Sequence, residues 1–232
     1  TPSTMGSTSP VALILGQGAR VGKSVAAAFA NKGYRIALVA RSLDEANSTA
    51  NELHIKGDFA DSSSIPAIFS KVEAKFGPPA VVIYNAGATT FNDKTDPLSV
   101  PLENFERHFA INTTSAFMAA KHAALAFATL PASASRTFIF TGNCTNVMPI
   151  ASLFDQGAGK TASAYVMRVA AEAYKDKGFK FYYADERKAD GSPAYGAIDG
   201  DAHGEMYTEL AEGTEQGPWS QTFVKGFGYK EF

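Results

Sequence analysis

The chain has 232 residues, 45% of them apolar, a formal net charge of −2 at pH 7 and one cysteine. The near balance of charge disfavours nucleic acid and anionic membranes as partners, and one cysteine excludes an internal disulfide framework and a thiolate metal cluster. The length and apolar content suffice for one substantial core. We therefore predict a soluble cytoplasmic protein of one domain, with no metal site and no membrane span.

The first residues are small and polar, and we predict that 1–10 form a flexible lead-in outside the fold. The next stretch, Val11–Ala30, begins with an apolar run that is typical of a buried parallel strand and continues into an Ala-rich helix. Between them lies a tight turn with three glycines: Gly16, Gly18 and Gly22. Free N–H groups at a helix start bind anions, so this turn is predicted to hold a pyrophosphate. The alternative is a tight turn without a ligand.

A second strand, Tyr34–Ala40, ends directly before Arg41 and Ser42, and a helix is predicted from there to about Leu53. In dinucleotide-binding folds an arginine at this strand end accommodates the 2′-phosphate of NADP, whereas an acidic residue bonds the ribose hydroxyls of NAD. Arg20 in the glycine turn is expected to converge with Arg41 on that phosphate. This favours NADP(H) as the cofactor. The alternative is that both arginines are solvated surface residues.

The later elements continue the alternation of apolar strands and helical segments. Further strands are predicted at His54–Phe59, Ala80–Tyr84, Arg136–Thr141 and Phe179–Ala184, with helices ending near Phe76 and spanning Leu102–Thr129. The alternation predicts a Rossmann-type doubly wound parallel sheet, an α/β fold, in a single domain over 11–232. A substrate loop or lid is expected over about 185–220, including a short helix at His203–Glu212. A terminal edge strand is expected at Tyr229–Phe232.

Several of these segments resemble the short-chain dehydrogenase/reductase family. Gly16–Gly22 resembles its T-G-x-x-x-G-x-G loop, and Asn85-Ala86-Gly87 after the fourth strand matches its N-A-G signature. Asp58-Phe59-Ala60-Asp61 resembles the D-x-x-D segment that contacts adenine, and Ile111-Asn112-Thr113 resembles the V-N segment. The resemblance covers Val11–Lys177. It implies these cofactor-binding residues: Gly16, Gly18, Arg20, Val21, Gly22, Arg41, Ser42, Asp58, Phe59, Asn85, Ala86, Gly87 and Lys160.

The catalytic pattern of that family is incomplete in this chain. The family carries Y-x-x-x-K on the helix after the fifth strand and a serine at the end of that strand, but here Lys160 follows Gln156, and the serine position is Asn143. Asn112 matches the asparagine that helps to hold a water beside the catalytic lysine. A glutamine amide donates a hydrogen bond but cannot supply a proton near neutral pH. The resemblance thus implies a site that binds a polar group without the family's acid.

Other residues are candidates for the missing acid. Asp155 is one, although an exposed residue at the helix start is the more frequent role for such an aspartate. Tyr182 and Tyr183 end the sixth strand on opposite faces, so that one of them is able to reach the pocket. Cys144 is interpreted as a small buried residue, and Tyr165 as part of the core. Four further side chains line the pocket or pack on the sheet: His203, Met206, Tyr207 and Trp219.

The leading hypothesis is an NADP(H)-dependent reductase with a degenerate catalytic tetrad, which acts on a small molecule with an activated C=O, C=N or conjugated group. The alternatives are a non-redox cyclase or isomerase on the same scaffold and a catalytically silent NADP(H)-binding protein. The resemblance also implies a homodimer or homotetramer paired through the Ala-rich helices of Ser115–Leu130 and Thr161–Ala173.

Overall fold

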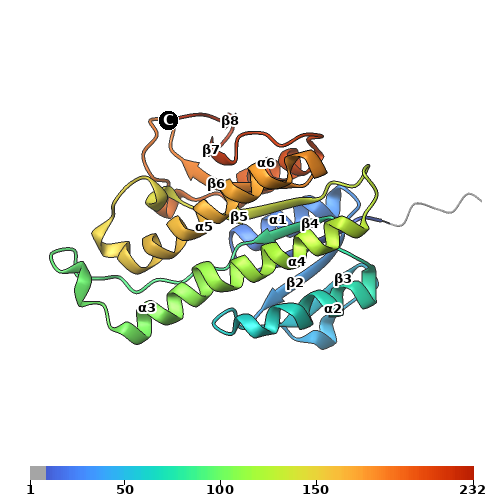
Figure 1. Cartoon of the computed structure of the whole chain (residues 1–232), viewed down its shortest axis with the longest axis horizontal. Coiled ribbons are helices and arrows are strands. Elements are labelled where there is room, and N and C mark those ends of the chain that lie inside the picture. Colours follow the sequence, from blue (N-terminus) through green and yellow to red (C-terminus); the bar gives the residue numbers. More distant parts are fainter. Residues whose placement is uncertain (1–8) are drawn as a thin grey trace, which may run out of the picture.

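The strands form one sheet in the order β3-β2-β1-β4-β5-β6-β7-β8, in a computed structural model that describes residues 9–232 (Figure 1). Their bounds are β1 (Val11–Leu15), β2 (Arg35–Ala40), β3 (Glu52–Lys56), β4 (Val81–Tyr84), β5 (Thr137–Thr141), β6 (Lys180–Arg187), β7 (Ser220–Val224) and β8 (Gly228–Tyr229). All neighbours pair in parallel except β7 and β8. The predicted doubly wound parallel sheet is therefore confirmed. Most of the predicted lead-in, 1–8, lies outside the described residues.

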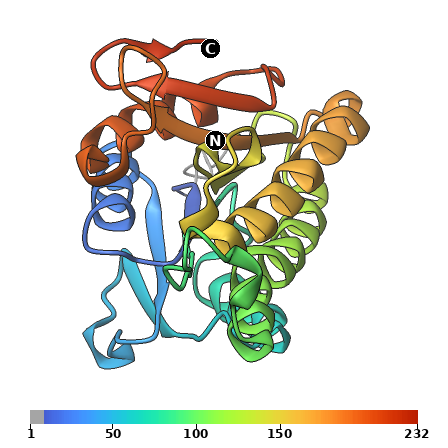
Figure 2. The ribbon, with the colours of Figure 1, turned by 90° about the vertical axis from the view of Figure 1, so that its left-hand side faces the viewer.

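Helices cover both faces of the sheet. One face carries α1 (Val21–Asn31) and α6 (Gly200–Glu212), and the other carries α2 (Ile65–Phe76), α4 (Ser115–Thr129) and α5 (Phe154–Tyr174). Figure 2 shows α1 and α6 on one side of the sheet and α4 and α5 on the other. The chain order reverses between β1 and β4, and sheets of this kind bind ligands at the carboxyl ends of the strands at such a reversal.

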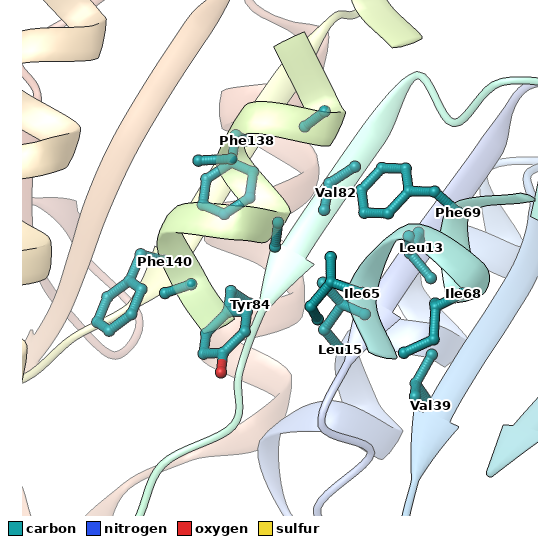
Figure 3. Packing of buried hydrophobic residues seen from close by; sticks show 14 of the residues in the cluster. Leu13, Leu15, Val39, Ile65, Ile68, Phe69, Val82, Tyr84, Phe138 and Phe140 are labelled. Carbon is teal, nitrogen blue, oxygen red and sulfur yellow. The ribbon is translucent and has the colours of Figure 1, made fainter. Parts of the chain in front are cut away.

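The apolar runs of the strands are explained by burial on two faces. Leu13 and Leu15 of β1 belong to the cluster under α2, α4 and α5, whereas Ala12 and Ile14 belong to the cluster under α1 and α6. Figure 3 shows the first cluster, in which Phe69 of α2 lies beside Leu13 and Val82. A strand that is buried on both faces has no polar positions, which is why these runs read as continuous rather than alternating.

The predicted helix from Arg41 to Leu53 is wrong. A single 3-10 turn at Glu45–Asn47 precedes β3, and short polar side chains satisfy the backbone there. Asp44 accepts from the N–H of Ala46, and the Ser48 hydroxyl donates to the Glu45 carbonyl and accepts from the His54 N–H. Such local side-chain bonds compete with helix formation. The helix predicted over Leu102–Thr129 is also interrupted, because a π-turn at Ala110–Thr114 separates α3 (Leu102–Phe109) from α4.

The lid that was predicted over 185–220 needs correction. β6 extends to Arg187 because β7, which was not predicted, pairs with its Tyr183–Arg187 part, so the charged residues at 185–187 lie inside the sheet. α6 is a layer of the fold that packs on α1: a Cβ atom added to Gly204 would lie 2.9 Å from the Ala28 Cβ atom. The edge strand expected at Tyr229–Phe232 is the two-residue β8. Among the described residues, no helix combines the length and apolar character needed to cross a bilayer.

Candidate active site

The glycine turn after β1 is held in place by the loop after β4. Gly16 has a φ of 101°, and a Cβ atom on it would lie 2.5 Å from the Ala86 nitrogen. The Asn85 Nδ2 atom donates to the Gly16 carbonyl at 2.9 Å. A Cβ atom on Gly22 would lie 2.6 Å from that same carbonyl oxygen. Only glycine therefore fits these two positions. The Gly16 carbonyl consequently lies close to the first turn of α1.

The start of α1 has free donors. Within the described residues, the N–H groups of Val21 and Gly22 bond to no acceptor, whereas those of Lys23 and Ser24 bond to the carbonyls of Gly18 and Arg20. Free N–H groups and the helix dipole make this end attractive to an anion. The backbone here fits the pyrophosphate of a dinucleotide, because the glycines leave open the space that side chains would fill.

A cavity of about 540 Å³ opens beside this turn. Most of the residues predicted to bind the cofactor line it: Gly16, Gly18, Arg41, Asp58, Phe59, Asn85, Ala86 and Gly87. Ser42 is exposed and does not line it. The Asp58 carboxylate also accepts from the Ala60 N–H at 3.0 Å, so that it fixes its own loop.

The expected convergence of Arg20 with Arg41 is not seen. Arg41 lines the cavity beside the glycine turn, whereas Arg20, at the start of α1, lines a second cavity of about 490 Å³. Both side chains are exposed, and neither has an ion-pair partner among the described residues. Arg41 is therefore the arginine that lies beside Asp58, where adenine is expected to bind.

The second cavity brings together three of the predicted catalytic residues. Asn143, Gln156 and Lys160 line it, with Val21, Cys144 and His203. The two cavities share Gly18 and Asn85, so that the glycine turn and Lys160 lie along one continuous edge of the sheet. This edge is formed by the carboxyl ends of the parallel strands (Figure 1).

Lys160 is buried under the loop after β4. Its ammonium group donates to the Thr141 carbonyl at 3.0 Å and lies 5.7 Å from the centre of the Phe140 ring. A Cβ atom on Gly87 would lie 3.9 Å from the Lys160 Nζ atom. Burial lowers the pKa of Lys160 to about 8, although the Asp185 carboxylate partly opposes this effect. Lys160 is thus a cation at neutral pH, beside the N-A-G segment.

Asn143 and Gln156 bond to each other. The Asn143 Nδ2 atom donates to the Gln156 Oε1 atom at 2.8 Å, and the Asn143 Oδ1 atom accepts from the Thr145 N–H at 3.0 Å. The Asn143 amide is therefore bonded within the protein through its oxygen and one of its two N–H groups. In this pair Gln156 uses its Oε1 atom, and its NH₂ group bonds to no acceptor among the described residues.

Asn112 contacts the loop after β4 with its whole amide. Its Oδ1 atom accepts from the Ala88 N–H at 3.1 Å, and its Nδ2 atom donates to the Ala88 carbonyl at 2.7 Å. Asn112 lies in the π-turn between α3 and α4, and its own carbonyl accepts from the Ser163 hydroxyl at 2.7 Å. The side chain therefore positions the segment that carries Gly87.

Asp155 is fully buried, and the expectation of an exposed residue is wrong. Its carboxylate bonds to His108 Nδ1 at 2.5 Å, to the Thr89 hydroxyl and to the N–H groups of Thr90 and Gln156. Burial by itself raises the pKa of Asp155, but these hydrogen bonds outweigh burial and leave the pKa below its ordinary value. Asp155 does not line the cavity of Lys160. It joins α5 to α3 and to the loop after β4, and is not placed to donate a proton.

The two tyrosines are also unavailable as acids. The Tyr183 hydroxyl donates to the Asn143 carbonyl and accepts from the Asn143 N–H, and the Tyr182 hydroxyl contacts the backbone at 215–217. Burial raises the pKa of both phenols. Met206 and Tyr207 belong to the core between α6 and the sheet, and Trp219 packs on Tyr183.

Sequence reasoning missed the charged residues of β6. Asp185 and Glu186 line the cavity with Lys160, and Arg187 donates from Nε to the Asp185 Oδ2 atom at 2.6 Å. Burial raises the pKa of Asp185 to about 6, and Arg187 limits the rise. His203 Nδ1 lies 3.5 Å from the Glu186 carboxylate. A strand with three consecutive charges had been interpreted as a loop, and only the pairing with β7 reveals it.

Comparisons with known proteins agree with this geometry. The family model of the short chain dehydrogenases matches residues 10–183. The short chain dehydrogenase/reductase dmxR12 of Cryptosporiopsis sp. (strain 8999) is 45% identical over 236 residues, which cover 97% of this chain and 96% of that protein. The chain therefore belongs to the short-chain dehydrogenase/reductase family, whose members are oxidoreductases. The matched region ends directly before the charged part of β6.

Two further relatives extend the comparison. A probable tetrahydroxynaphthalene reductase of Zymoseptoria tritici is 30% identical over 122 residues, which cover 49% of this chain and 45% of that protein. The crystal structure of a metagenomic short-chain oxidoreductase in complex with NADP superposes with a TM-score of 0.79 at 20% identity, covering 94% of this chain and 98% of that one. The second likeness establishes the fold.

Proposed function

We propose that the protein is an NADP(H)-dependent reductase that acts on a conjugated or otherwise activated small molecule. One observation carries the proposal: the glycine turn and Lys160 line two adjoining cavities that share Gly18 and Asn85. The free backbone donors that suit a pyrophosphate belong to Val21 and Gly22 at the start of α1, and Val21 lines the second cavity. The second has the ammonium group and amide donor that suit the reacting end of the cofactor and a polar substrate.

The residues of the first cavity would hold the adenosine end of the cofactor. Asp58 and Phe59 would contact adenine, and Arg41 would contact the 2′-phosphate with a guanidinium group that has no ion-pair partner among the described residues. Lys160 would contact the nicotinamide ribose. The bound cofactor supplies the hydride, and the protein supplies position and charge.

The absence of the tyrosine limits the substrate. Reduction of a plain ketone needs a proton at the oxygen as the alkoxide forms, and neither Gln156 nor the anionic Asp155 is suited to supply it. A conjugated acceptor needs less help, because the negative charge that arises is delocalised. The name of the hydroxynaphthalene reductase relative supports a conjugated substrate for this chain also.

The first test is a fluorescence titration with NADPH and NADH on the wild type and on Arg41→Asp. We expect tighter binding of NADPH, and loss of that preference in the variant. Lys75→Asp makes the same change of charge at the end of α2 and should leave the preference intact. Failure to bind either nucleotide would contradict the proposal. Tight binding without NADPH oxidation across a panel of conjugated electrophiles would favour a silent binding protein or a non-redox enzyme.

We also propose that the protein is a homodimer or homotetramer paired through α4 and α5. These helices expose Phe117, Leu125 and Val169, and also Tyr165, for which the prediction of a core position is wrong. They flank a largely apolar cavity of about 370 Å³. Light scattering on the wild type and on Leu125→Glu tests this pairing. A wild type that is monomeric at micromolar concentration would contradict it.

A further inference from the structure

The amide of Asn143 is held in one orientation by a group that can only donate. The backbone N–H of Thr145 points at the Asn143 Oδ1 atom at 3.0 Å, and the Thr145 hydroxyl bonds to the same atom at 2.5 Å. A backbone N–H has no lone pair, so the atom that faces it must be the oxygen. The Asn143 NH₂ group therefore points the other way, toward Gln156.

This orientation fixes the amide of Gln156 in turn. The Asn143 Nδ2 atom lies 2.8 Å from Gln156 and must donate to its Oε1 atom. The Gln156 Nε2 atom is then on the far side of the amide, and it bonds to no acceptor among the described residues. Since Gln156 lines the cavity of Lys160, two N–H donors are left for a ligand. The Tyr position of the family is thus occupied by an amide whose NH₂ group is available to donate.

The Lys160 ammonium group adds positive charge near Gln156, and the acceptors of this cavity have partners within the protein. The Lys160 ammonium group lines the same cavity and uses one donor on the Thr141 carbonyl. The Asn143 carbonyl is occupied by the Tyr183 hydroxyl. The carboxylates in this cavity come from β6 and have partners: Asp185 is paired with Arg187, and Glu186 accepts from the Asp199 N–H.

We propose that this site holds the reacting oxygen of its substrate without a proton, first as the oxygen of a conjugated carbonyl and then as the enolate oxygen that hydride addition forms, which a phenolate imitates. The inference rests on the proposed function and narrows it, because the Gln156 NH₂ group and the Lys160 ammonium group donate to an oxygen and do not accept from an iminium or a hydroxyl hydrogen. Hydride addition to a conjugated carbonyl leaves the electron pair on that oxygen as an enolate. Gln156 and Lys160 stabilise this anion, and water supplies the proton to carbon in a later step.

The test uses 4-nitrophenol, whose phenolate has a visible absorption band that the neutral phenol lacks. The probe is titrated with the protein at several pH values, with and without NADP⁺, so that the apparent pKa of the bound probe is read directly from the spectrum. We expect a pKa lowered by at least one unit, which is about a tenfold preference for the phenolate. A bound probe that stays neutral, or no binding at all to protein that binds NADPH, would overturn the inference.

Gln156→Met tests the donor alone, whereas Asn143→Asp turns the donor away and also adds a negative charge. Gln156→Met keeps the length of the side chain and removes the donors, so the phenolate preference should fall about tenfold with no change in charge. Asn143→Asp presents an oxygen to Gln156, which must then turn its NH₂ group away from the cavity, and the preference should be lost or reversed. Leu153→Val, in the same cavity, should leave the preference as in the wild type.

The nucleotide measurements distinguish this inference from the proposed function. If the protein binds the phenolate but no nicotinamide nucleotide, the reductase proposal fails and the oxyanion site stands. If NADPH is bound and oxidised while the probe binds only as the neutral phenol, the oxyanion site fails and the reductase proposal stands.

Discussion

The two halves of the carboxyl edge of the sheet are built on different principles. The half beside β1, β2 and β4 depends on the backbone: Gly16 and Gly22 fit where a Cβ atom would clash, and Asn85 bonds to a main-chain carbonyl. The half beside β5 and β6 depends on side chains, with Asn143, Gln156 and Lys160 around one cavity. No side chain can replace the glycines at these two positions, whereas polar side chains that line a cavity can be exchanged without a change in the backbone.

The exchange is internally consistent. Asn143 and Gln156, which the family resemblance aligns with a serine and a tyrosine, bond to each other at 2.8 Å. Replacing one alone would leave a polar group without a partner at the edge of a cavity, which costs free energy. Under the proposed function, this pair keeps a hydrogen bond in the site while it removes the family's titratable phenol. The proposal therefore implies a change of chemistry without a change in the fold.

The largest expected effect comes from restoring the acid. In the double variant Asn143→Ser with Gln156→Tyr, Lys160 would lie beside a phenol, and general acid catalysis typically contributes roughly 10² to 10⁴ in rate. We expect reduction of plain ketones to rise by at least about 100-fold, measured as NADPH oxidation. The control replaces Gln156 by Phe in place of Tyr. An equal gain in that control would show that the shape of the aromatic ring, and not proton transfer from its hydroxyl, raises the rate.

The next effect concerns Asp155, which connects the two halves. It bonds to the loop after β4 through Thr89 and Thr90, and to α3 through His108. Asp155→Ala leaves these donors buried without an acceptor, so the free energy of unfolding should fall by about 3 to 5 kcal/mol. Urea denaturation measures it. Asp93→Ala, in an exposed turn, should cost less than about 1 kcal/mol; equal losses would contradict the assigned role.

Replacing Lys160 should change the free energy of unfolding by a smaller amount and in the opposite direction, because it should stabilise the protein. Its pKa is lowered to about 8 by burial, so the unfolded chain binds more protons between about pH 8 and the ordinary lysine value. The penalty is complete below about pH 8 and disappears as the pH rises above it. Lys160→Met should therefore raise the free energy of unfolding at pH 7 by about 2 kcal/mol, after the lost hydrogen bond is subtracted.

The pH dependence provides the check on that sign. The advantage of Lys160→Met over the wild type should shrink between pH 8 and pH 10 as the wild type gains stability. Lys71→Met, on the exposed face of α2, should show no such change. A variant at Lys160 that is less stable than the wild type at pH 7 would mean that the buried ammonium group is not penalised.

The smallest effect separates the two arginines. Arg41→Ala should weaken NADPH binding about tenfold relative to NADH, because a charge-assisted hydrogen bond to the phosphate is lost. Arg20→Ala should change that ratio less than about twofold, since Arg20 lines the other cavity. Isothermal titration of both nucleotides measures the ratio. Comparable effects of the two variants would mean that Arg20 and Arg41 both contact the 2′-phosphate, although they line different cavities.

Local signals account for what could be predicted of the site. The glycine turn, the N-A-G segment and the spacing of Gln156 and Lys160 each depend on residues within a few positions of one another, so a single sequence displays them. Asp185 and Glu186 gave no such signal. Three consecutive charges are typical of a loop, and their place inside the sheet follows from pairing with β7, whose residues lie 37 positions later in the chain.

Burial and pairing between distant segments decided the features of the fold and the site that the sequence did not predict. The sequence by itself determined the order of the strands from β1 to β6, the parallel sheet and the glycine turn, because apolar periodicity and glycine positions act over short distances. Only the tertiary structure decided that Asp155 is buried against His108, that α6 packs on α1, and that Gln156 has its NH₂ group free. Each of these depends on partners from another element, and the environment of a polar side chain is set by what packs around it.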